Sequence, residues 1–392
     1  MFRPYIKRTY ILVLVAMINL LLVYVSYQSH SFTKSKDYEL KIEAATIMKN
    51  ALDLTKELDK PKVVDRFKSG LVGVDSTDSQ MTTKRGFLES KVATTNPNFA
   101  AIFIDWFSAI GISSNISNVS DTIAVSMTGS FPGANIAFLS ACKASNVYPV
   151  IISSIGSSSW GANQIDKTWI EIESTLLDAD FFNYKSKAFS LGGDNDQLDE
   201  LSDYTKQILE NKIIKNNYDI ISGAQMQEAV NKRIKKYKEQ SSNYKAYVNI
   251  GGSSASLGDS TTSKMYLPGL IFGKDEAIAD ALDDEYYDEY EYQQEIIPVI
   301  EYFLSEQKIP VINVRNINNL CEWYGLPYSN LSFNDDNVKV GSGDLFGVKT
   351  KHRFSVVWLS TLASLALIAW LAISSLIQVN NKMKEIDNDS II

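Results

Sequence analysis

Residues 123–163 read IAVSMTGSFPGANIAFLSACKASNVYPVIISSIGSSSWGAN. Two apolar runs, residues 123–127 and 148–155, flank a segment of small residues, 134–144, and each run leads into a glycine- and serine-rich loop. Apolar, β-branched runs of this length are typical of buried strands, and the intervening segment is long enough for a helix. The stretch therefore predicts a strand–helix–strand unit, with loops at the carboxyl ends of its strands, where α/β proteins bind ligands.

The same alternation continues along the chain. An almost wholly apolar helix is expected at residues 99–110, with Asn96 as its N-cap and Pro97 at its first position. Further strands are expected at residues 188–191, 218–221, 247–250 and 309–314, and further helices at residues 166–179, 201–216, 225–239 and 317–324. Strands that alternate with helices predict a mainly parallel α/β sheet covered on both faces, in a Rossmann-like domain.

Four of these strands end in loops of the same kind: GSFPG (129–133), GSSSWGAN (156–163), GGDND (192–196) and GGSSAS (251–256). In a parallel sheet such loops converge on one edge, where unobstructed backbone N–H groups and a helix N-terminus can bind a carboxylate or phosphate. The predicted ligand-binding residues are Gly129, Ser130, Gly133, Asn135, Gly156, Ser157, Trp160, Asn163, Gly192, Gly193, Asp194, Gly251, Gly252 and Ser256.

The chemistry at these loops is limited by what the sequence lacks. Residues 129–133 match neither common nucleotide-binding glycine pattern, so a nucleotide is not indicated and no cofactor is expected. The histidines, His30 and His352, lie beside the apolar ends of the chain, which excludes a Ser-His-Asp triad and a histidine-ligated metal site between them. Ser130 lies where a nucleophile could, but no lysine or carboxylate at fixed spacing supplies its base. Whether the chain is an enzyme stays open, with Ser130 as the catalytic candidate.

Several features allow two interpretations. The Ser/Thr-rich segment 71–95 is either a solvated connection or a segment folded over the strand ends. Asp194 and Asp196 either hold a hard cation or form a turn, and no metal site is assigned. Trp160 is either a stacking or lid residue or a core anchor. The acidic, tyrosine-rich run 283–295 is either solvated surface or a cation or docking site.

Composition and charge bound the class of protein. The chain has 392 residues, 45% of them hydrophobic, which is enough for one large domain or two small ones. The net charge is −8 and no basic cluster lies in the middle of the chain, so nucleic acid is not an expected partner. The two cysteines, Cys142 and Cys321, could pair outside the cytoplasm or remain as buried thiols.

Two apolar stretches predict membrane spans. Residues 10–27 follow a basic N-terminus (1–9) and favour a signal anchor over a cleaved signal peptide; residues 354–379 are long enough to cross a bilayer, and a core helix is the alternative. Between them we expect a helical connector at 28–69 (a helix over 37–59, ended by Pro61) and the α/β domain at 70–345, with a polar tail at 380–392. The first span's flanking charges place the central domain outside the cytoplasm, although the basic residues before the second span favour the opposite orientation.

Several motifs resemble the poly-gamma-glutamate system protein family (PgsW-like). The resemblance rests on SFPGAN (130–135), SSIGSSSWGAN (153–163), LGGD (191–194), YVNIGG (247–252) and PVIN (310–313), with TT (82–83) and NPNFAA (96–101). It covers residues 70–330 in matching order, and 153–163 is its most specific part. The chain departs from the pattern at Ser253, where we expect glycine, and in the acidic insert 283–295.

The resemblance implies a two-pass protein of the bacterial inner (cytoplasmic) membrane that works in capsule biosynthesis. Its implied partners are the poly-gamma-glutamate synthase membrane components and the gamma-linked glutamate polymer or oligomer; no catalytic residues are carried over. Three functions compete: a binding or assembly component, a gamma-glutamyl hydrolase or transferase with a serine nucleophile and no histidine, and a solute receptor unrelated to the polymer. A net charge of −8 favours a local anion pocket over a polymer-wide groove.

Overall fold

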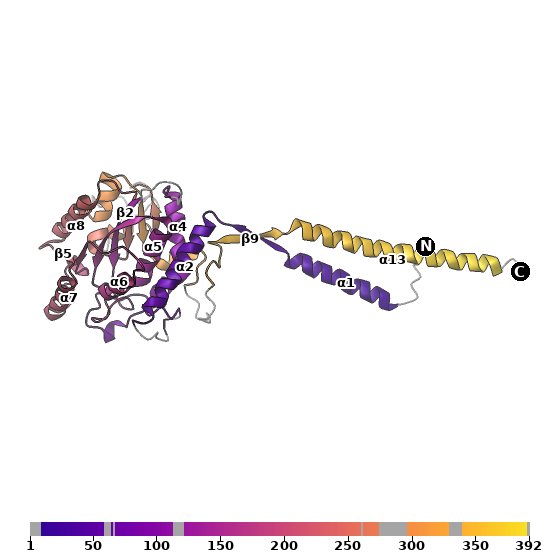
Figure 1. Cartoon of the computed structure of the whole chain (residues 1–392), viewed down its shortest axis with the longest axis horizontal. Helices are drawn as coiled ribbons and strands as arrows, with labels where there is room; N and C mark the ends of the chain where they lie inside the picture. Colours follow the sequence, from indigo (N-terminus) through magenta and orange to yellow (C-terminus); the bar gives the residue numbers. More distant parts are fainter. Residues whose placement is uncertain are drawn as a thin grey trace, which may run out of the picture. The chain divides into compact units, whose positions relative to one another are not determined.

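A computed structural model describes residues 9–58, 64–65, 67–112, 121–259, 262–273, 296–328 and 339–389, which fall into two units. The central unit, Ser35–Phe346, contains a seven-stranded sheet in the order β5-β4-β3-β2-β6-β8-β7 (Figure 1). Its strands are β2 (Thr122–Thr128), β3 (Tyr148–Ser154), β4 (Ala188–Ser190), β5 (Asp219–Ile221), β6 (Ala246–Ile250), β7 (Gly269–Ile271) and β8 (Val311–Val314). β7 pairs antiparallel with β8, whereas the other described neighbours are parallel. The predicted α/β class with a mainly parallel sheet is confirmed; the edge strand β7 was not predicted.

Helices cover both faces of this sheet. The longer ones are α2 (Tyr38–Thr55), α4 (Ala100–Ala109), α5 (Pro132–Ser145), α6 (Trp169–Asp178), α7 (Asp203–Lys215) and α8 (Met226–Gln240). Shorter ones are α3 (Leu88–Ala93), α9 (Ser254–Leu257), α11 (Val299–Glu301) and α12 (Ile317–Trp323), with the single turns η1 (Ser76–Asp78), η2 (Pro97–Phe99), η3 (Asp194–Asp196), η4 (Thr262–Met265) and η5 (Tyr302–Glu306). Asn96 caps η2 through its side chain and Pro97 follows, as predicted.

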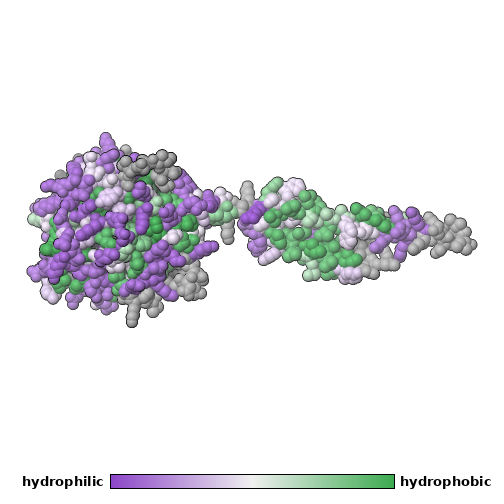
Figure 2. Space-filling view, in the orientation of Figure 1, coloured by the Kyte–Doolittle hydropathy of each residue, from purple (hydrophilic) through white to green (hydrophobic). Residues whose placement is uncertain are grey.

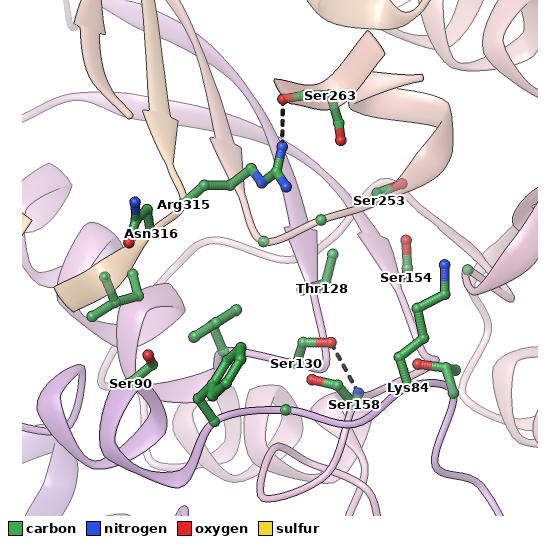
Figure 3. A pocket seen from close by; sticks show the side chains of 18 of the residues that line it. Lys84, Ser90, Thr128, Ser130, Ser154, Ser158, Ser253, Ser263, Arg315 and Asn316 are labelled. Atoms are coloured by element: carbon green, nitrogen blue, oxygen red, sulfur yellow. Dashed lines mark hydrogen bonds between the residues drawn. The ribbon is translucent and has the colours of Figure 1, made fainter. Parts of the chain in front are cut away.

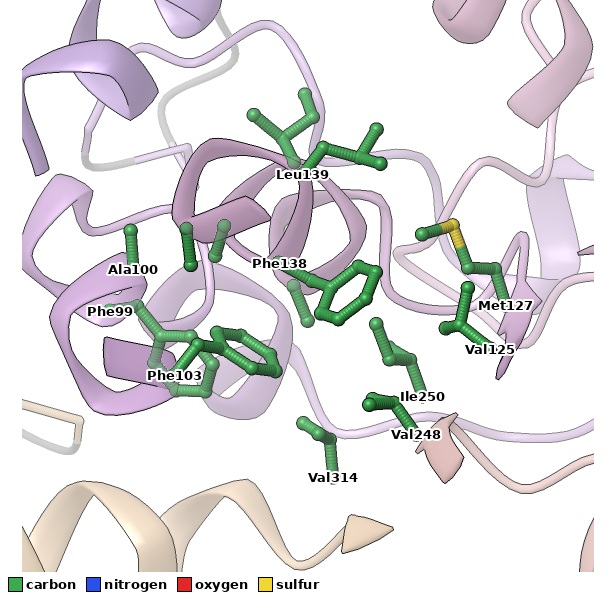
Figure 4. Packing of buried hydrophobic residues seen from close by; sticks show 14 of the residues in the cluster. Phe99, Ala100, Phe103, Val125, Met127, Phe138, Leu139, Val248, Ile250 and Val314 are labelled. Atoms are coloured by element: carbon green, nitrogen blue, oxygen red, sulfur yellow. The ribbon is translucent and has the colours of Figure 1, made fainter. Parts of the chain in front are cut away.

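Two hydrophobic clusters lie on opposite faces of the sheet. Ile123 and Val125 of β2 belong to one cluster, whereas Ala124 between them belongs to the other. In the first, Phe138 of α5 packs edge-on against Phe103 of α4, with ring centroids 5.5 Å apart (Figure 4). The second is filled from α8, α9, α11 and η5. Alternate strand residues are therefore buried on both faces, which explains the uninterrupted apolar runs in the sequence.

α2 belongs to the core of the central unit. Ala44, Met48 and Ala51 are fully buried, and the helix packs against α4 and α5. Lys41 is also buried, and its ammonium lies 2.6 Å from Asp105 of α4. Part of the region expected to be a connector (28–69) thus packs within the α/β unit, whereas Pro61 lies outside the described residues.

The direction in which strands are added reverses at β2. β3, β4 and β5 extend the sheet on one side of β2, and β6 and β8 extend it on the other. The carboxyl ends of β2 and β6 therefore flank the switch point, where open α/β sheets bind their ligands.

The second unit consists of the two ends of the chain. β1 (His30–Lys34) pairs antiparallel with β9 (Gly347–His352), so the end of α1 (Thr9–Gln28) lies beside the start of α13 (Phe354–Asp389). Both helices are long and apolar enough to cross a membrane, over Thr9–Gln28 and Phe354–Lys384. Figure 2 shows hydrophobic residues over this part of the surface. The two predicted spans are thus helices whose apolar side chains face outward.

Candidate functional site

A pocket of about 690 Å³ lies at the carboxyl ends of the parallel strands (Figure 3). Its lining includes residues that follow β2, β3, β4 and β6, together with the start of α12. The four glycine- and serine-rich loops therefore converge, as their positions in the sequence predict. The predicted ligand-binding residues that line the pocket are Ser130, Gly156, Gly192, Gly193, Gly251 and Gly252.

Other predicted residues shape the loops after β2 and β3 from behind. Gly129 donates its N–H to Ser154 O at 3.0 Å, and the hydroxyl of Ser157 donates to Gly129 O at 3.0 Å. Asn135 is fully buried and donates from Nδ2 to Thr128 O at 3.0 Å. A Cβ on Gly133 would lie 2.6 Å from Thr94 O, so glycine lets α5 approach α3 closely. These residues position the loops and are absent from the pocket lining.

The remaining predicted residues form hydrogen bonds or ion pairs with other residues of the protein. Asn163 bonds Val74 at both ends of its amide, at 2.9 and 3.0 Å. Trp160 exchanges backbone hydrogen bonds with Val74 and Gly73. The hydroxyls of Ser256 and Tyr247 lie 2.5 Å apart. Asp194 forms an ion pair of 2.6 Å with Lys84.

The Ser/Thr-rich segment 71–95 folds over the strand ends. Thr83 donates its N–H to Ser157 O at 2.9 Å, and Ser159 donates to Lys84 O at 3.0 Å. These bonds pair the segment with the loop after β3 and bring residues 83–87, Ser90 and Lys91 into the pocket wall. Of the two interpretations of this segment, the folded-back one is confirmed.

Five basic residues line the pocket: Lys84, Arg85, Lys91, Lys264 and Arg315. No acidic residue is among the described residues that line it, although the chain as a whole has a net charge of −8. Arg315 directly follows β8 and donates from Nη1 to Ser263 O at 2.6 Å. Burial lowers the pKa of this guanidinium. Lys84 is paired with Asp194, and burial lowers the pKa of Lys91 to about 7. The positive charge that suits the wall to an anion therefore comes mainly from Arg85, Lys264 and Arg315.

Lys91 differs from the other basic residues because it is buried. Its side chain is 3% exposed, and Nζ donates to Ser130 O at 2.5 Å. Nζ also lies 2.8 Å from Ser158 Oγ and 3.6 Å from the centroid of the Phe131 ring. Burial lowers the pKa of Lys91 to about 7, and no carboxylate among the described residues pairs with it. Near neutral pH this amine can exist without its proton and act as a base.

Ser130 and Ser158 have different environments. The backbone N–H of Ser158 donates to Ser130 Oγ at 3.0 Å, as drawn in Figure 3. Ser130 therefore orients the neighbouring loop, and the lysine amine reaches its carbonyl oxygen. The hydroxyl that contacts the amine is that of Ser158, which is half-buried in the pocket wall.

Two hydroxyls in the pocket lining lack partners. Thr128 Oγ1 and Ser253 Oγ are buried and have no hydrogen bond within the described residues. Thr128 and Ser253 are 5% and 6% exposed, so their hydroxyls are largely shielded from water. A buried hydroxyl without a hydrogen-bond partner carries a desolvation penalty. Each hydroxyl could donate a hydrogen bond to an oxygen atom of a ligand.

A buried ion pair fixes the loop after β4. Arg233 of α8 and Asp196 lie 2.7 Å apart, and each side chain is 1% exposed. The Ser190 hydroxyl donates to Asp196 at 2.8 Å, and its oxygen lies 3.2 Å from the hydroxyl oxygen of Ser154, a pocket residue. Because Asp194 and Asp196 are both paired with basic side chains, they form a structural turn. The described residues contain no cluster of three or more potential metal ligands.

Sequence reasoning missed Lys91 and Arg315. Lys91 lies on α3, a six-residue helix in a segment without hydrophobic periodicity. The position of Arg315 could have been predicted, because this residue directly follows the predicted strand 309–314 and must lie at the carboxyl end of that strand. The adjacent pair Lys84–Arg85 in a Ser/Thr-rich segment was a second signal.

Comparisons of the chain with models of known protein families, with curated proteins and with solved structures find no match.

Proposed function

We propose that the central unit binds gamma-linked glutamate, as a component of a bacterial poly-gamma-glutamate synthesis and export system. The observation that carries the proposal is the positively charged pocket, which has five basic and no acidic residues among its described lining. Arginine and lysine beside open glycine loops are suited to a ligand that bears several carboxylates. In this proposal the sheet is a Rossmann-like one, with its ligand at the switch point between β2 and β6.

The form of the pocket supports an oligomer segment as the ligand. A volume of about 690 Å³ is within the range of small-molecule sites and too small for a long polymer. The motifs that resemble the family, 130–135 and 153–163, supply Ser130, Gly156 and Ser158 to its wall. The identity of the polymer rests on that resemblance, whereas the charge of the ligand rests on the pocket.

Calorimetry on the purified full chain in detergent tests this function. We expect gamma-linked tetraglutamate to bind more tightly than alpha-linked tetraglutamate or inorganic phosphate. Arg315→Gln should weaken binding about tenfold, the loss of roughly 1.4 kcal/mol from one charge-assisted contact. Lys236→Gln removes an equal charge from α8, at an exposed pair with Asp219, and should leave the affinity unchanged. Absence of binding, or equal effects of the two variants, would contradict the proposal; tighter binding of phosphate would assign the pocket to another anion.

We also propose that the chain spans the bacterial inner membrane twice, with the central unit outside the cytoplasm. The antiparallel pairing of β1 with β9 suits two adjacent spans whose outer ends meet, which puts both chain termini on one side. Arg3, Lys7 and Arg8 before the first span favour the cytoplasmic side for the termini.

Cysteine labelling of intact cells tests this orientation. Tyr204 of α7 and Met383 of α13 are exposed, at 69% and 54%, whereas both native cysteines are buried. Tyr204→Cys should react with a membrane-impermeant maleimide, and Met383→Cys should react only after the cells are opened. The reverse pattern would place the central unit in the cytoplasm.

A further inference from the structure

The contact between Lys91 and Ser158 is not explained by anion binding alone. A lysine that only attracts an anion needs neither burial nor a serine hydroxyl beside its amine. Lys91 is 3% exposed, yet its amine borders an open pocket and lies 2.8 Å from Ser158 Oγ. A buried ammonium without a carboxylate is costly, so the structure keeps this group for a reason other than stability.

We propose that Ser158 and Lys91 form a nucleophile–base pair that transfers the acyl group of an anionic substrate. Resting on the function proposed above, the bond that they cleave is a gamma-glutamyl amide. Serine–lysine pairs are one of the known ways to activate a hydroxyl without histidine. The catalytic serine is therefore Ser158, and Ser130 orients it by accepting its backbone N–H.

The surroundings of the pair suit this chemistry. The Phe131 ring, with its centroid 3.6 Å from Nζ, covers the amine and limits its contact with water. Ser130 O accepts a hydrogen bond from the amine at 2.5 Å, which helps to orient the nitrogen lone pair of the neutral amine. Gly86 leaves room beside both groups, because a Cβ there would lie 3.1 Å from Lys91 Cε and 3.2 Å from Ser158 Oγ. Neutral Lys91 can then accept the Ser158 hydroxyl proton across 2.8 Å.

The reaction balances with water or an amine as the second substrate. Ser158 Oγ attacks the amide carbonyl carbon while its proton passes to Lys91 Nζ. The tetrahedral intermediate collapses, the C–N bond breaks, and the Lys91 ammonium returns the proton to the leaving amine. This leaves an ester on Ser158 and neutral Lys91. Water or another amine, deprotonated by Lys91, attacks the ester and regenerates the serine; water gives hydrolysis and an amine gives transfer.

Labelling with a fluorophosphonate tests the pair on the full chain in detergent. We expect one phosphonate adduct, mapped by peptide mass spectrometry to Ser158 and lost in Ser158→Ala. The labelling rate should rise with pH through about 7, because a protonated Lys91 cannot take the proton. Lys91→Met should lower the rate about 100-fold or more. Lys91→Arg keeps a cation, so it would restore a structural role but should leave labelling as low as Lys91→Met. Ser241→Ala, a serine after α8 and outside the pocket lining, is the control.

Hydrolysis of gamma-linked tetraglutamate, followed by mass spectrometry, separates this inference from the proposed function. Cleavage that is lost in Ser158→Ala, while calorimetry shows that this variant still binds the oligomer, supports both. Oligomer binding without cleavage and without an adduct at Ser158 overturns the inference and leaves the binding function in place. An adduct at Ser158 without oligomer binding supports the pair and overturns the proposed ligand. An adduct at another serine, or equal labelling of the two Lys91 variants and the native chain, overturns the pair.

Discussion

Lys91 Nζ lies 2.8 Å from Ser158 Oγ, although 67 residues separate the two in the sequence. The contact depends on the segment before α3, whose backbone pairs with the loop after β3 through Thr83 and Ser157. The phenyl ring of Phe131, from the loop after β2, covers the amine. Three separate parts of the chain thus create one buried base, and its protonation has measurable consequences for stability as well as for chemistry.

The pKa of Lys91 predicts a change of stability with pH. Its pKa is about 7 in the folded chain and 10.5 as the ordinary value, so between these pH values the unfolded chain binds the extra proton. The free energy of unfolding should therefore rise with pH across this window, by at most about 1.4 kcal/mol per pH unit from this group. Below pH 7 the cost of burying the charge is present in full.

Urea denaturation of the full chain, compared with Lys91→Met from pH 6 to 9, measures this effect. The difference between the two proteins isolates Lys91, because the other titrating groups are shared. We expect Lys91→Met to gain most relative to the native chain at pH 6 and progressively less above pH 7. A difference that does not change with pH would show that Lys91 keeps an ordinary pKa.

The sequence predicted those parts of the fold that depend on local pattern. Uninterrupted apolar runs, separated by helical segments, correctly predicted β2, β3, β6 and β8. The loops after β2, β3, β4 and β6 converge at one edge of the sheet, as expected for parallel strands. α3 and β7 are six and three residues long, too short for a period to show, and tertiary hydrogen bonds determine their positions. Lys91 was missed for this reason, because its role depends on contacts with residues distant in the sequence.

The two cysteines should be unreactive in the folded protein. Cys142 and Cys321 are free and fully buried. Burial raises the pKa of the Cys142 thiol well above its usual range and that of Cys321 to about 12, so neither forms a thiolate at pH 8. We expect Ellman's reagent to detect no thiol in the native chain in detergent and two after denaturation. Detection of fewer than two after denaturation without a reductant would indicate that they pair.

Removal of one partner of the buried ion pair between Arg233 and Asp196 should strongly destabilise the protein. Removing one partner from a buried pair leaves an uncompensated charge, so Arg233→Met should cost about 3–5 kcal/mol of unfolding free energy. Replacing both, as Arg233→Met with Asp196→Leu, should recover part of this loss because no charge stays buried. Lys236→Ala, which breaks an exposed pair on the same helix, should cost about 1 kcal/mol or less. Urea midpoints measure all three; a small effect of Arg233→Met would mean that water reaches the pair.

Two glycines in the pocket wall should differ sharply in their tolerance of a methyl group. A Cβ on Gly86 would lie 2.6 Å from Ser159 O, closer than real contacts allow, and would also press on Lys91 and Ser158. Gly86→Ala should therefore cost about 1–3 kcal/mol and separate the amine from the hydroxyl. A Cβ on Gly252 would meet nothing within 4 Å, so Gly252→Ala should change stability by about 0.5 kcal/mol or less.

Urea denaturation and fluorophosphonate labelling of the two glycine variants form the matched comparison. Gly86→Ala should lose labelling at Ser158 at urea concentrations where the protein is still folded, because the displaced amine no longer accepts the hydroxyl proton. Gly252→Ala adds the same methyl group to the same pocket without touching the pair. If both variants lost labelling equally, the methyl group would be blocking entry of the probe, and the contact between Lys91 and Ser158 would not determine reactivity. If Gly86→Ala kept full labelling, proton transfer to Lys91 would not need the observed geometry.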